Sequence, residues 1–221
     1  MSKMANVIVL VEGPTEQLFI KKILAPYLGS KNVFLHPSIP GNPRQKGGDV
    51  RFAKFKKDIG IQLKQCPNAW VTLLVDYYGI KTDWPGYEQA KRQNGHTKKF
   101  EVMCQETKRE VEKLFANAAR RFIPYISMHE FETLLFSDPA ILANGLGVQQ
   151  VAIDDILRKC GEAEAINDKP DTAPSKRLKS LSSCFIKTVT GISIAQEIGI
   201  DAMRKACPLF SAWIKQLESL R

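Results

Sequence analysis

The chain has 221 residues, of which 44% are hydrophobic and 25% charged, and its formal net charge is +9. These proportions are typical of a globular protein, and the apolar runs are far too short to span a bilayer. The first apolar run ends at Glu12 instead of a small-residue cleavage site, so a secretory signal peptide is not indicated. The five cysteines are irregularly spaced and form no C-x-x-C pair, which argues for reduced thiols in a cytoplasm and against a disulfide framework or zinc site.

A short apolar run near the N-terminus predicts a strand over residues 6–12. Its lack of polar positions is typical of a strand that is buried on both faces, as in a parallel sheet. Pro14 suits the first position of a helix, which we expect over residues 14–29. Glu12 and Glu16 are therefore expected at the carboxyl end of a central strand, the edge where open α/β sheets place their ligands.

A second strand is expected over residues 32–36, followed by a loop over residues 37–48 and a basic helix that ends near residue 65. Seven Lys or Arg residues fall between positions 42 and 64, against two Asp. The apolar residues of this stretch recur at helical spacing, which predicts a buried stripe and a basic outer face. Two explanations stay open, a solvated helix face or a surface that binds a polyanion. If nucleic acid binds there, the predicted contacts are Arg51, Lys54 and Lys57.

The later predicted strands also lead into acidic residues. A strand over residues 70–76 ends in Asp76, and a strand over residues 122–127 leads to Glu130 and Glu132. A long amphipathic helix is expected between them. Strands that alternate with helices predict a mainly parallel sheet flanked by helices.

Helical patterns predominate beyond residue 130. We therefore divide the chain into an α/β domain over residues 1–136 and a helical C-terminal extension, residues 137–221, that packs on it. Residues 162–175 are expected to form a loop or linker, and residues 208–220 a closing helix.

Acidic side chains thus follow three of the predicted strands. If the sheet order brings these strands together, four or five carboxylates gather at one edge and raise one another's pKa unless a cation neutralises them. Mg²⁺, or Mn²⁺ in its place, prefers oxygen ligands and bridges carboxylates to phosphate oxygens, which fits phosphoryl transfer. The expected metal ligands are Glu12, Glu16, Asp76, Glu130 and Glu132.

Each acid also has a structural explanation. Glu16 suits the first turn of a helix because of the helix dipole, and Asp76 suits a turn that follows a strand. Glu130 and Glu132 share a face only if the strand continues, and they diverge by about 200° if a helix has begun. The recurrence of acids at the ends of apolar strands favours a shared site.

Three segments near these acids are VEGPTE at residues 11–16, DYYG at 76–79 and HEFETLLF at 129–136. The tail adds APSKRL at 173–178 and CPLF at 207–210. Together these segments, which spread over nearly the whole chain, resemble the bacterial proteins grouped as domain of unknown function 4276 (DUF4276). That family looks like a branch of the Toprim superfamily, the metal-binding domain of topoisomerases, bacterial primases and overcoming-lysogenization-defect nucleases.

The resemblance implies a Toprim-like, Rossmann-like sheet with an acidic Mg²⁺ site. Glu12 matches the invariant Toprim glutamate and Asp76 the first aspartate of the D-x-D motif, whereas Tyr78 stands in place of the second aspartate. The other acids of the predicted cluster then supply the missing ligands. Members of the family often resemble partners of neighbouring ATPases in mobile-element or phage-defence gene pairs, so an ATPase partner is also implied.

Basic residues follow the proline-containing loop of the C-terminal part. In a nuclease, Lys176 or Lys187 would neutralise the scissile phosphate in the transition state, and Arg177 would contact nucleic acid. The alternative is a helix that Ser175 caps, with its basic residues facing solvent.

The function that we expect from the sequence is a Mg²⁺-dependent nuclease. The sequence lacks a Walker P-loop, a dinucleotide-binding fingerprint and a nucleophile elbow, and the residue at position 133 excludes a zinc-protease helix. Two rival hypotheses stay open. One is a non-catalytic subunit that binds nucleic acid or an ATPase, which agrees with Tyr78, and the other is nucleotidyl transfer like that of primase.

Overall fold

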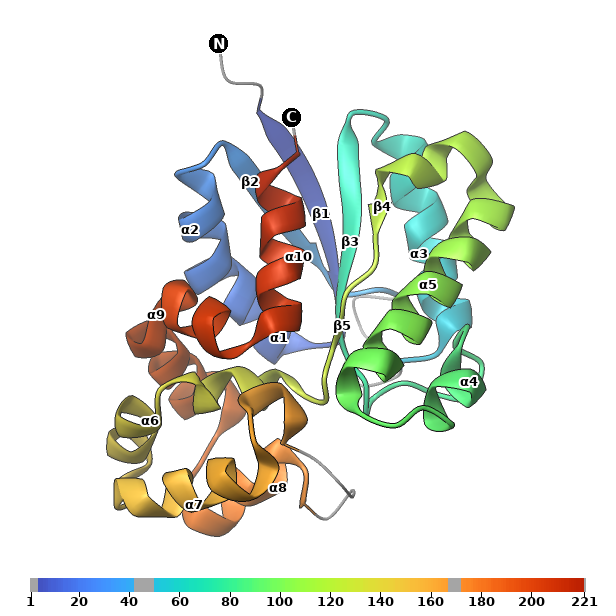
Figure 1. Ribbon diagram of the computed structural model, residues 1–221. Coiled ribbons are helices and arrows are strands. Elements are labelled where there is room, and N and C mark those ends of the chain that lie inside the picture. The colour runs from blue at the N-terminus through green and yellow to red at the C-terminus, as the bar shows by residue number, and fades with distance from the viewer. Residues whose placement is uncertain (1–3, 42–49, 167–171, 221) are drawn as a thin grey trace.

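The computed structural model describes residues 4–41, 50–166 and 172–220. Its centre is a parallel sheet with the strand order β2-β1-β3-β4, and β5 also pairs with β3 (Figure 1). Helices cover both faces of the sheet, so the predicted mainly parallel α/β sheet flanked by helices is confirmed. The strands are β1 (Ala5–Val11), β2 (Val33–Ser38), β3 (Ala69–Asp76), β4 (Phe122–Ile123) and β5 (Ile126–Ser127).

The central strand β1 is apolar because both of its faces are buried. Val7, Val9 and Val11 belong to one hydrophobic core, whereas Ile8 and Leu10 belong to a second core on the opposite face. Successive side chains of a strand point to opposite faces, so a sheet covered on both sides requires an unbroken apolar run.

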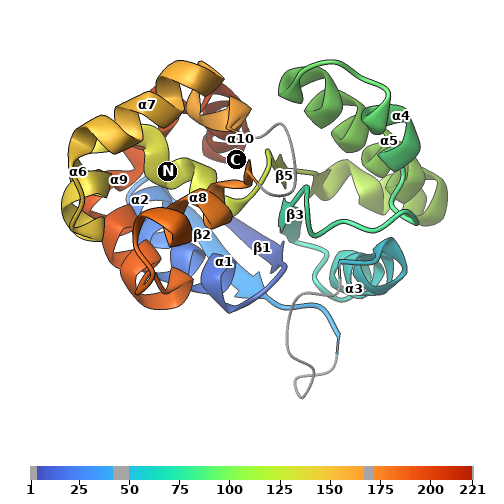
Figure 2. The ribbon, with the colours of Figure 1, turned by 90° about the horizontal axis from the view of Figure 1, so that it is seen from below.

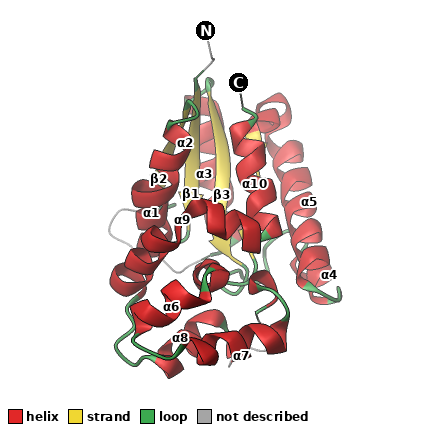
Figure 3. Ribbon diagram, turned by 60° about the vertical axis from the view of Figure 1, so that its left-hand side comes forward, coloured by secondary structure: helices red, strands yellow, loops and turns green. Residues whose placement is uncertain are grey.

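Helices from both ends of the chain cover the first core, and Figure 3 shows the strands enclosed between helices. Near the N-terminus these are α1 (Pro14–Phe19), the π-helical turn η1 (Ile20–Leu24) and α2 (Ala25–Gly29). The C-terminal part contributes α9 (Ile192–Ala206) and α10 (Pro208–Glu218).

The helix α10 packs directly on the sheet. Nε1 of Trp213 donates to Oγ1 of Thr72 on β3 at 2.9 Å, and the Trp213 ring stacks on Tyr125 with centroids 4.5 Å apart. One hydrophobic core therefore runs across residue 136, and the domain boundary placed there stays a prediction.

The second core lies on the other face of the sheet, under α3 (Phe52–Gln65) and α5 (His96–Phe115). The short helix α4 (Tyr87–Lys91) and the 3-10 turn η2 (Ala116–Arg121) flank α5 (Figure 1).

A group of small helices lies below the carboxyl ends of the strands (Figures 1 and 2). The members of this group are η3 (Phe131–Ser137), α6 (Pro139–Leu146), α7 (Gln150–Cys160), η4 (Ala163–Ala165), α8 (Pro174–Leu181) and η6 (Lys187–Gly191).

Prolines explain two differences from the predicted elements. The helix expected over residues 14–29 contains a π turn, in which the N–H of Ala25 bonds to the carbonyl of Ile20, just before Pro26. Pro26 lacks an N–H, so a regular helical bond is lost at this point. The strand expected over residues 122–127 is split into β4 and β5 at Pro124, which cannot donate to a sheet ladder.

The loop predicted over residues 37–48 and the linker predicted over residues 162–175 lie partly outside the described residues. Within the described ranges, every helix is too short or too polar to cross a membrane.

A candidate carboxylate site at the carboxyl edge of the sheet

Glu12 and Asp76 are neighbours because β1 and β3 pair in parallel. Val11, the last residue of β1, is in register with Leu74, so the next residue reaches the end of β3. The backbone N–H of Asp76 donates to Oε2 of Glu12 at 3.3 Å. The structure therefore brings together two acids that are far apart in the sequence.

The turn after β3 leaves room for the Glu12 side chain at Gly79. The N–H of Gly79 donates to the carbonyl of Asp76 at 3.0 Å, which turns the backbone back toward the strand end. A Cβ at position 79 would lie 2.6 and 2.8 Å from the two carboxylate oxygens of Glu12. Gly79 was not predicted as a site residue, although a glycine shortly after a strand-end acid is the signal that marks it.

The carboxylates at this edge are buried, with Glu16 6% and Asp76 7% exposed. Burial raises the pKa of Asp76 well above its usual range, and the charges of Glu16, Glu12 and Glu132 raise it further. Burial is also the main cause that raises the pKa of Glu12 and of Glu16. Among the described residues, Oδ1 of Asp76 has no hydrogen-bond partner. A buried oxygen without a partner is costly, so it marks a position suited to a ligand or a water.

The C-terminal part of the chain contributes a positively charged side chain, that of Lys187, to the site. Nζ of Lys187, the first residue of η6, lies 2.5 Å from Oε1 of Glu132. Glu132 is completely buried in η3, and its Oε2 has no hydrogen-bond partner in the described part of the chain. Burial raises the pKa of Glu132, and the charge of Lys187 offsets part of this effect. Burial lowers the pKa of Lys187, but Glu132 and the other nearby carboxylates outweigh it and raise that pKa overall, so the ammonium stays charged.

Glu130 binds a different partner from Glu132. Its Oε2 accepts the N–H of Ser175 at 2.8 Å, and its Oε1 accepts the Ser175 hydroxyl at 3.1 Å. Glu130 has extended backbone, and η3 begins immediately after it, so the two glutamates diverge. The expectation that Ser175 caps α8 is wrong, because Ala173 is the N-cap and Pro174 occupies the first helical position.

The other basic residues of the C-terminal part lie on α8. Lys176 is exposed. Nε of Arg177 donates to the carbonyl of Thr172 at 2.7 Å, and its guanidinium also reaches Sγ of Cys160 at 3.9 Å. Arg177 thus joins α8 to the end of α7, whereas Lys187 is the basic residue that contacts a buried carboxylate.

The basic residues predicted to contact nucleic acid lie at and beyond the start of α3. Val50 forms a parallel bridge with Ile80, so the exposed Arg51 lies beside the loop that follows Asp76. Lys54 is half-buried and Lys57 is exposed, further along the helix.

His129 is a feature of this edge that the sequence did not single out. It is 4% exposed, its ring stacks on that of Tyr78 with centroids 5.6 Å apart, and its Nδ1 has no hydrogen-bond partner among the described residues. Burial and the charges of Lys99 and His96 lower the pKa of His129 to about 4, so it is neutral at pH 7. His129 packs on the loop after β3 through its contact with Tyr78. The only sequence signal for this contact is the position of His129 beside Glu130 and Glu132.

The oxygen atoms at this edge fit a hard cation that is held by few protein ligands. No group of three or more His, Cys, Asp or Glu side chains in the described ranges is arranged to hold a metal ion. The described residues therefore do not assemble the five-carboxylate arrangement expected from the sequence. Mg²⁺ commonly keeps several waters and is bound through only one or two carboxylates. The unpartnered Oδ1 of Asp76, with Glu16 and Glu12 nearby, fits that mode of binding.

A family model described as "Domain of unknown function (DUF4276)" matches residues 11–218. Two solved structures of the C-terminal region of the Xanthomonas campestris pv. campestris OLD protein are also similar to the chain. One is 13% identical, covers 96% of this chain and 95% of that chain, and has a TM-score of 0.36. The other is 11% identical, covers 98% and 99%, and has a TM-score of 0.38. Comparison with curated proteins gives no match.

Proposed function

The chain belongs to the DUF4276 family, and we propose that it is a Toprim-like nuclease that uses Mg²⁺ or Mn²⁺ to hydrolyse phosphodiester bonds of nucleic acid. The observation that carries this proposal is the contact between Glu12 and the end of β3, beside the buried, unpartnered Oδ1 of Asp76. Carboxylates buried so close together need positive charge nearby. Lys187 pairs with Glu132 and Ser175 binds Glu130, which leaves Glu12, Glu16 and Asp76 for a cation.

Asp76 and Glu16 are the residues that we propose hold the ion. The charge of Glu16 is the largest electrostatic contribution to the raised pKa of Asp76 after burial itself, so these two side chains share one environment. Held by Asp76 and Glu16, a divalent ion would supply positive charge that lowers the pKa of a water and offsets the negative charge of the phosphate oxygens.

Glu12 is the residue that we propose as general base. Its raised pKa makes it a better proton acceptor than an exposed carboxylate, and the N–H of Asp76 and the surface of Gly79 hold it in place. The Glu12 carboxylate takes a proton from a water as the water oxygen bonds to phosphorus. The phosphorus–oxygen bond to the leaving strand then breaks, and the leaving oxygen takes a proton from solvent.

Lys187 is the residue that we propose stabilises the transition state. Its ammonium is charged, half-buried and held beside the carboxylates by Glu132. A fixed positive charge at this position offsets the negative charge that develops on the phosphoryl oxygens. We propose that Arg51, beside the loop after β3, binds the flanking phosphates and that Lys54 and Lys57 extend this basic surface along α3.

The test is cleavage of plasmid DNA and of RNA by the purified chain, with Mg²⁺ or Mn²⁺ compared with a chelator. We expect cleavage only with the metal, and a loss of about 100-fold or more in Glu12→Gln. Glu88→Gln, an exposed acid on α4 that pairs with Lys91, is the matched control and should retain activity. Cleavage that does not need metal, or full activity in Glu12→Gln, would contradict the mechanism.

One observation favours a second candidate function, a non-catalytic subunit that binds nucleic acid or a neighbouring ATPase. Position 78 contributes an aromatic ring stacked on His129 where the Toprim pattern has a carboxylate. Assembly with the ATPase without cleavage in the complex would support this candidate, and cleavage by the isolated chain would contradict it. Both proposals are compatible with a role in phage defence, because the family resemblance implies an ATPase partner from such gene pairs.

A further inference from the structure

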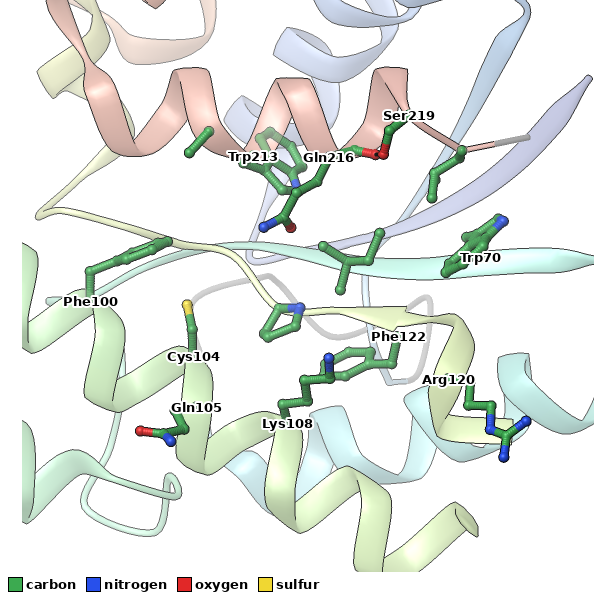
Figure 4. A pocket seen from close by; sticks show the side chains of 14 residues that line it. Trp70, Phe100, Cys104, Gln105, Lys108, Arg120, Phe122, Trp213, Gln216 and Ser219 are labelled. Carbon is green, nitrogen blue, oxygen red and sulfur yellow. Dashed lines mark hydrogen bonds between the residues drawn. The ribbon is translucent and has the colours of Figure 1, made fainter. Parts of the chain in front are cut away.

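A cavity of about 410 Å³ lies at the β4 edge of the sheet, between α5 and α10 (Figure 4). Its floor is formed by β4 and the start of β3. In Figure 4 the side chains of Trp213 and Gln216 descend from α10, and those of Cys104 and Lys108 project from α5 on the opposite side. Its volume falls within the range of about 300–1,000 Å³ that is typical of sites for small molecules.

Aromatic rings form the walls of the cavity. Trp70 from β3 and Phe100 from α5 are half-buried, so part of each ring surface faces the open space. Phe122 and Trp213 lie deeper and are each 2% exposed. Burial raises the pKa of the Cys104 thiol to about 12, so this residue lines the cavity as a neutral, weakly polar group.

The rim of the cavity is polar and positively charged. Lys108 from α5 and Arg120 from η2 are exposed, as are Gln105 from α5 and Gln216 from α10. No Asp or Glu is found among the described residues that line this space. The lining therefore combines flat apolar surfaces, two amides and two cations, and it favours a ligand that is flat and aromatic at one end and anionic at the other.

We propose that this cavity binds a nucleoside phosphate, either as a free nucleotide or as the terminal nucleotide of a strand. Aromatic side chains bind a base through its π-face, whatever its identity. Amide side chains offer both donors and acceptors to the edge of a base. Lys and Arg form charge-assisted hydrogen bonds with phosphate. Each part of the proposed ligand thus has a matching part of the cavity.

This site is separate from the carboxylate edge. Trp70 lies near the start of β3 and Asp76 at its end, so about 20 Å of extended strand separates them. Binding at the cavity does not require the proposed nuclease activity, and it can be measured with a chelator present. A negative result for one site therefore leaves the other site open to its own test.

The chain offers a fluorescence signal for this binding. Two of its three tryptophans, Trp70 and Trp213, line the cavity. The third, Trp84, is buried in the other core and donates from Nε1 to Thr107. We therefore propose to titrate the full chain, in EDTA, with AMP and UMP, with the matching nucleosides and with inorganic phosphate, following tryptophan fluorescence and the heat of binding.

We expect both nucleotides to bind more tightly than either nucleoside or inorganic phosphate. Lys108→Ala and Arg120→Ala should each weaken binding by about tenfold, since each removes one charge-assisted contact. Ala212→Phe, at an exposed position of α10 that lines the cavity, should fill the space and abolish binding. Lys113→Ala, which lies on the same helix as Lys108 and pairs with Glu110, is the matched control and should bind normally.

Comparison of the mononucleotides with a 5′-phosphorylated oligonucleotide distinguishes the two sources of the ligand. Tighter binding of the mononucleotide indicates a free nucleotide, and tighter binding of the oligonucleotide indicates a strand end. The proposal is overturned if the wild-type chain binds none of these at millimolar concentration. It is also overturned if Lys108→Ala and Ala212→Phe, shown to be folded by circular dichroism, bind as well as the wild type.

Discussion

The carboxylate of Glu12 lies so close to Gly79 that it would collide with a side chain at position 79. A Cβ there would be 2.6 Å from Oε2 of Glu12 and 2.9 Å from its carboxyl carbon. Such contacts require one of the two groups to move. The orientation of Glu12, the proposed general base, therefore requires that the residue at position 79 has no side chain.

Gly79→Ala should displace Glu12 without unfolding the protein. We expect the rate of metal-dependent cleavage to fall to the level of Glu12→Gln, because the carboxylate no longer faces the end of β3. Gly29→Ala is the control, since nothing lies within 4 Å of a Cβ at that position. Circular dichroism should show that both variants are folded, and normal cleavage by Gly79→Ala would contradict the proposed role of Glu12.

The ion pair of Lys187 and Glu132 should be revealed by a double-mutant cycle. Lys187→Met leaves the buried Glu132 without its partner, and we expect it to reduce the free energy of unfolding by about 2 kcal/mol. This value is below that of a fully buried pair because the Lys187 side chain is 38% exposed and screened by solvent. Lys187→Met combined with Glu132→Gln should recover much of the loss. Urea denaturation measures all four proteins, and purely additive effects would show that the pair is not coupled.

Metal binding should stabilise the chain more at high pH than at low pH. Burial raises the pKa of Asp76 and of Glu16, so protons compete with the ion for the carboxylates. We expect Mn²⁺ to raise the Tm relative to EDTA, with a larger shift at pH 8 than at pH 6. Asp76→Asn should lose this shift, whereas Glu12→Gln should retain part of it. A shift of the same size in Asp76→Asn would show that the ion binds elsewhere.

Glu164 should make the stability of the apo-protein depend on pH. This residue is 1% exposed, and its carboxylate accepts the N–H groups of Leu209 and Phe210 at the start of α10, at 2.8 and 2.9 Å. Burial raises the pKa of Glu164 to about 7, and the two hydrogen bonds only partly oppose it. Because the folded-state pKa is above the unfolded value of 4.5, the folded chain binds the proton more tightly.

The resulting contribution to stability is complete below pH 4.5 and is lost as the pH rises to about 7. The loss amounts to about 3 kcal/mol over that interval. Glu164→Gln should lack this dependence, so the difference in free energy of unfolding between wild type and variant should change across this interval. A constant difference between pH 4.5 and 7.5 would show that burial of Glu164 does not raise its pKa.

The packing of α10 on the sheet should be measurable through Trp213. Trp213→Phe removes the hydrogen bond to Thr72 and part of the stack on Tyr125, and we expect a loss of about 1–2 kcal/mol in stability. Trp70→Phe, at a half-buried position, should cost less. Stability is measured by chemical denaturation, and a Trp213→Phe variant as stable as the wild type would show that these contacts of α10 contribute little to the core.

Much of the fold can be predicted from local patterns in the sequence. The apolar runs of β1 and β3 mark strands buried on both faces, and the acids that follow them mark the edge where the ligands of such sheets bind. The apolar residues around Pro124 predicted one strand over residues 122–127, and the structure splits it at this proline. These features depend on side-chain periodicity and on proline chemistry, which act over a few residues.

The sequence was sufficient to predict acidic residues at the ends of the strands. It was also sufficient to predict a mainly parallel sheet, in which those strand ends share one edge. Which of these acids meet depends on the three-dimensional packing of the chain. Glu130 and Glu132 are two residues apart, yet Ser175 binds one and Lys187 the other, because η3 begins between them. The partners come from helices more than forty residues away in the chain, and their positions are set by how the C-terminal part packs below the sheet. Such long-range packing depends on the shape of the whole core, which no short pattern of residues encodes.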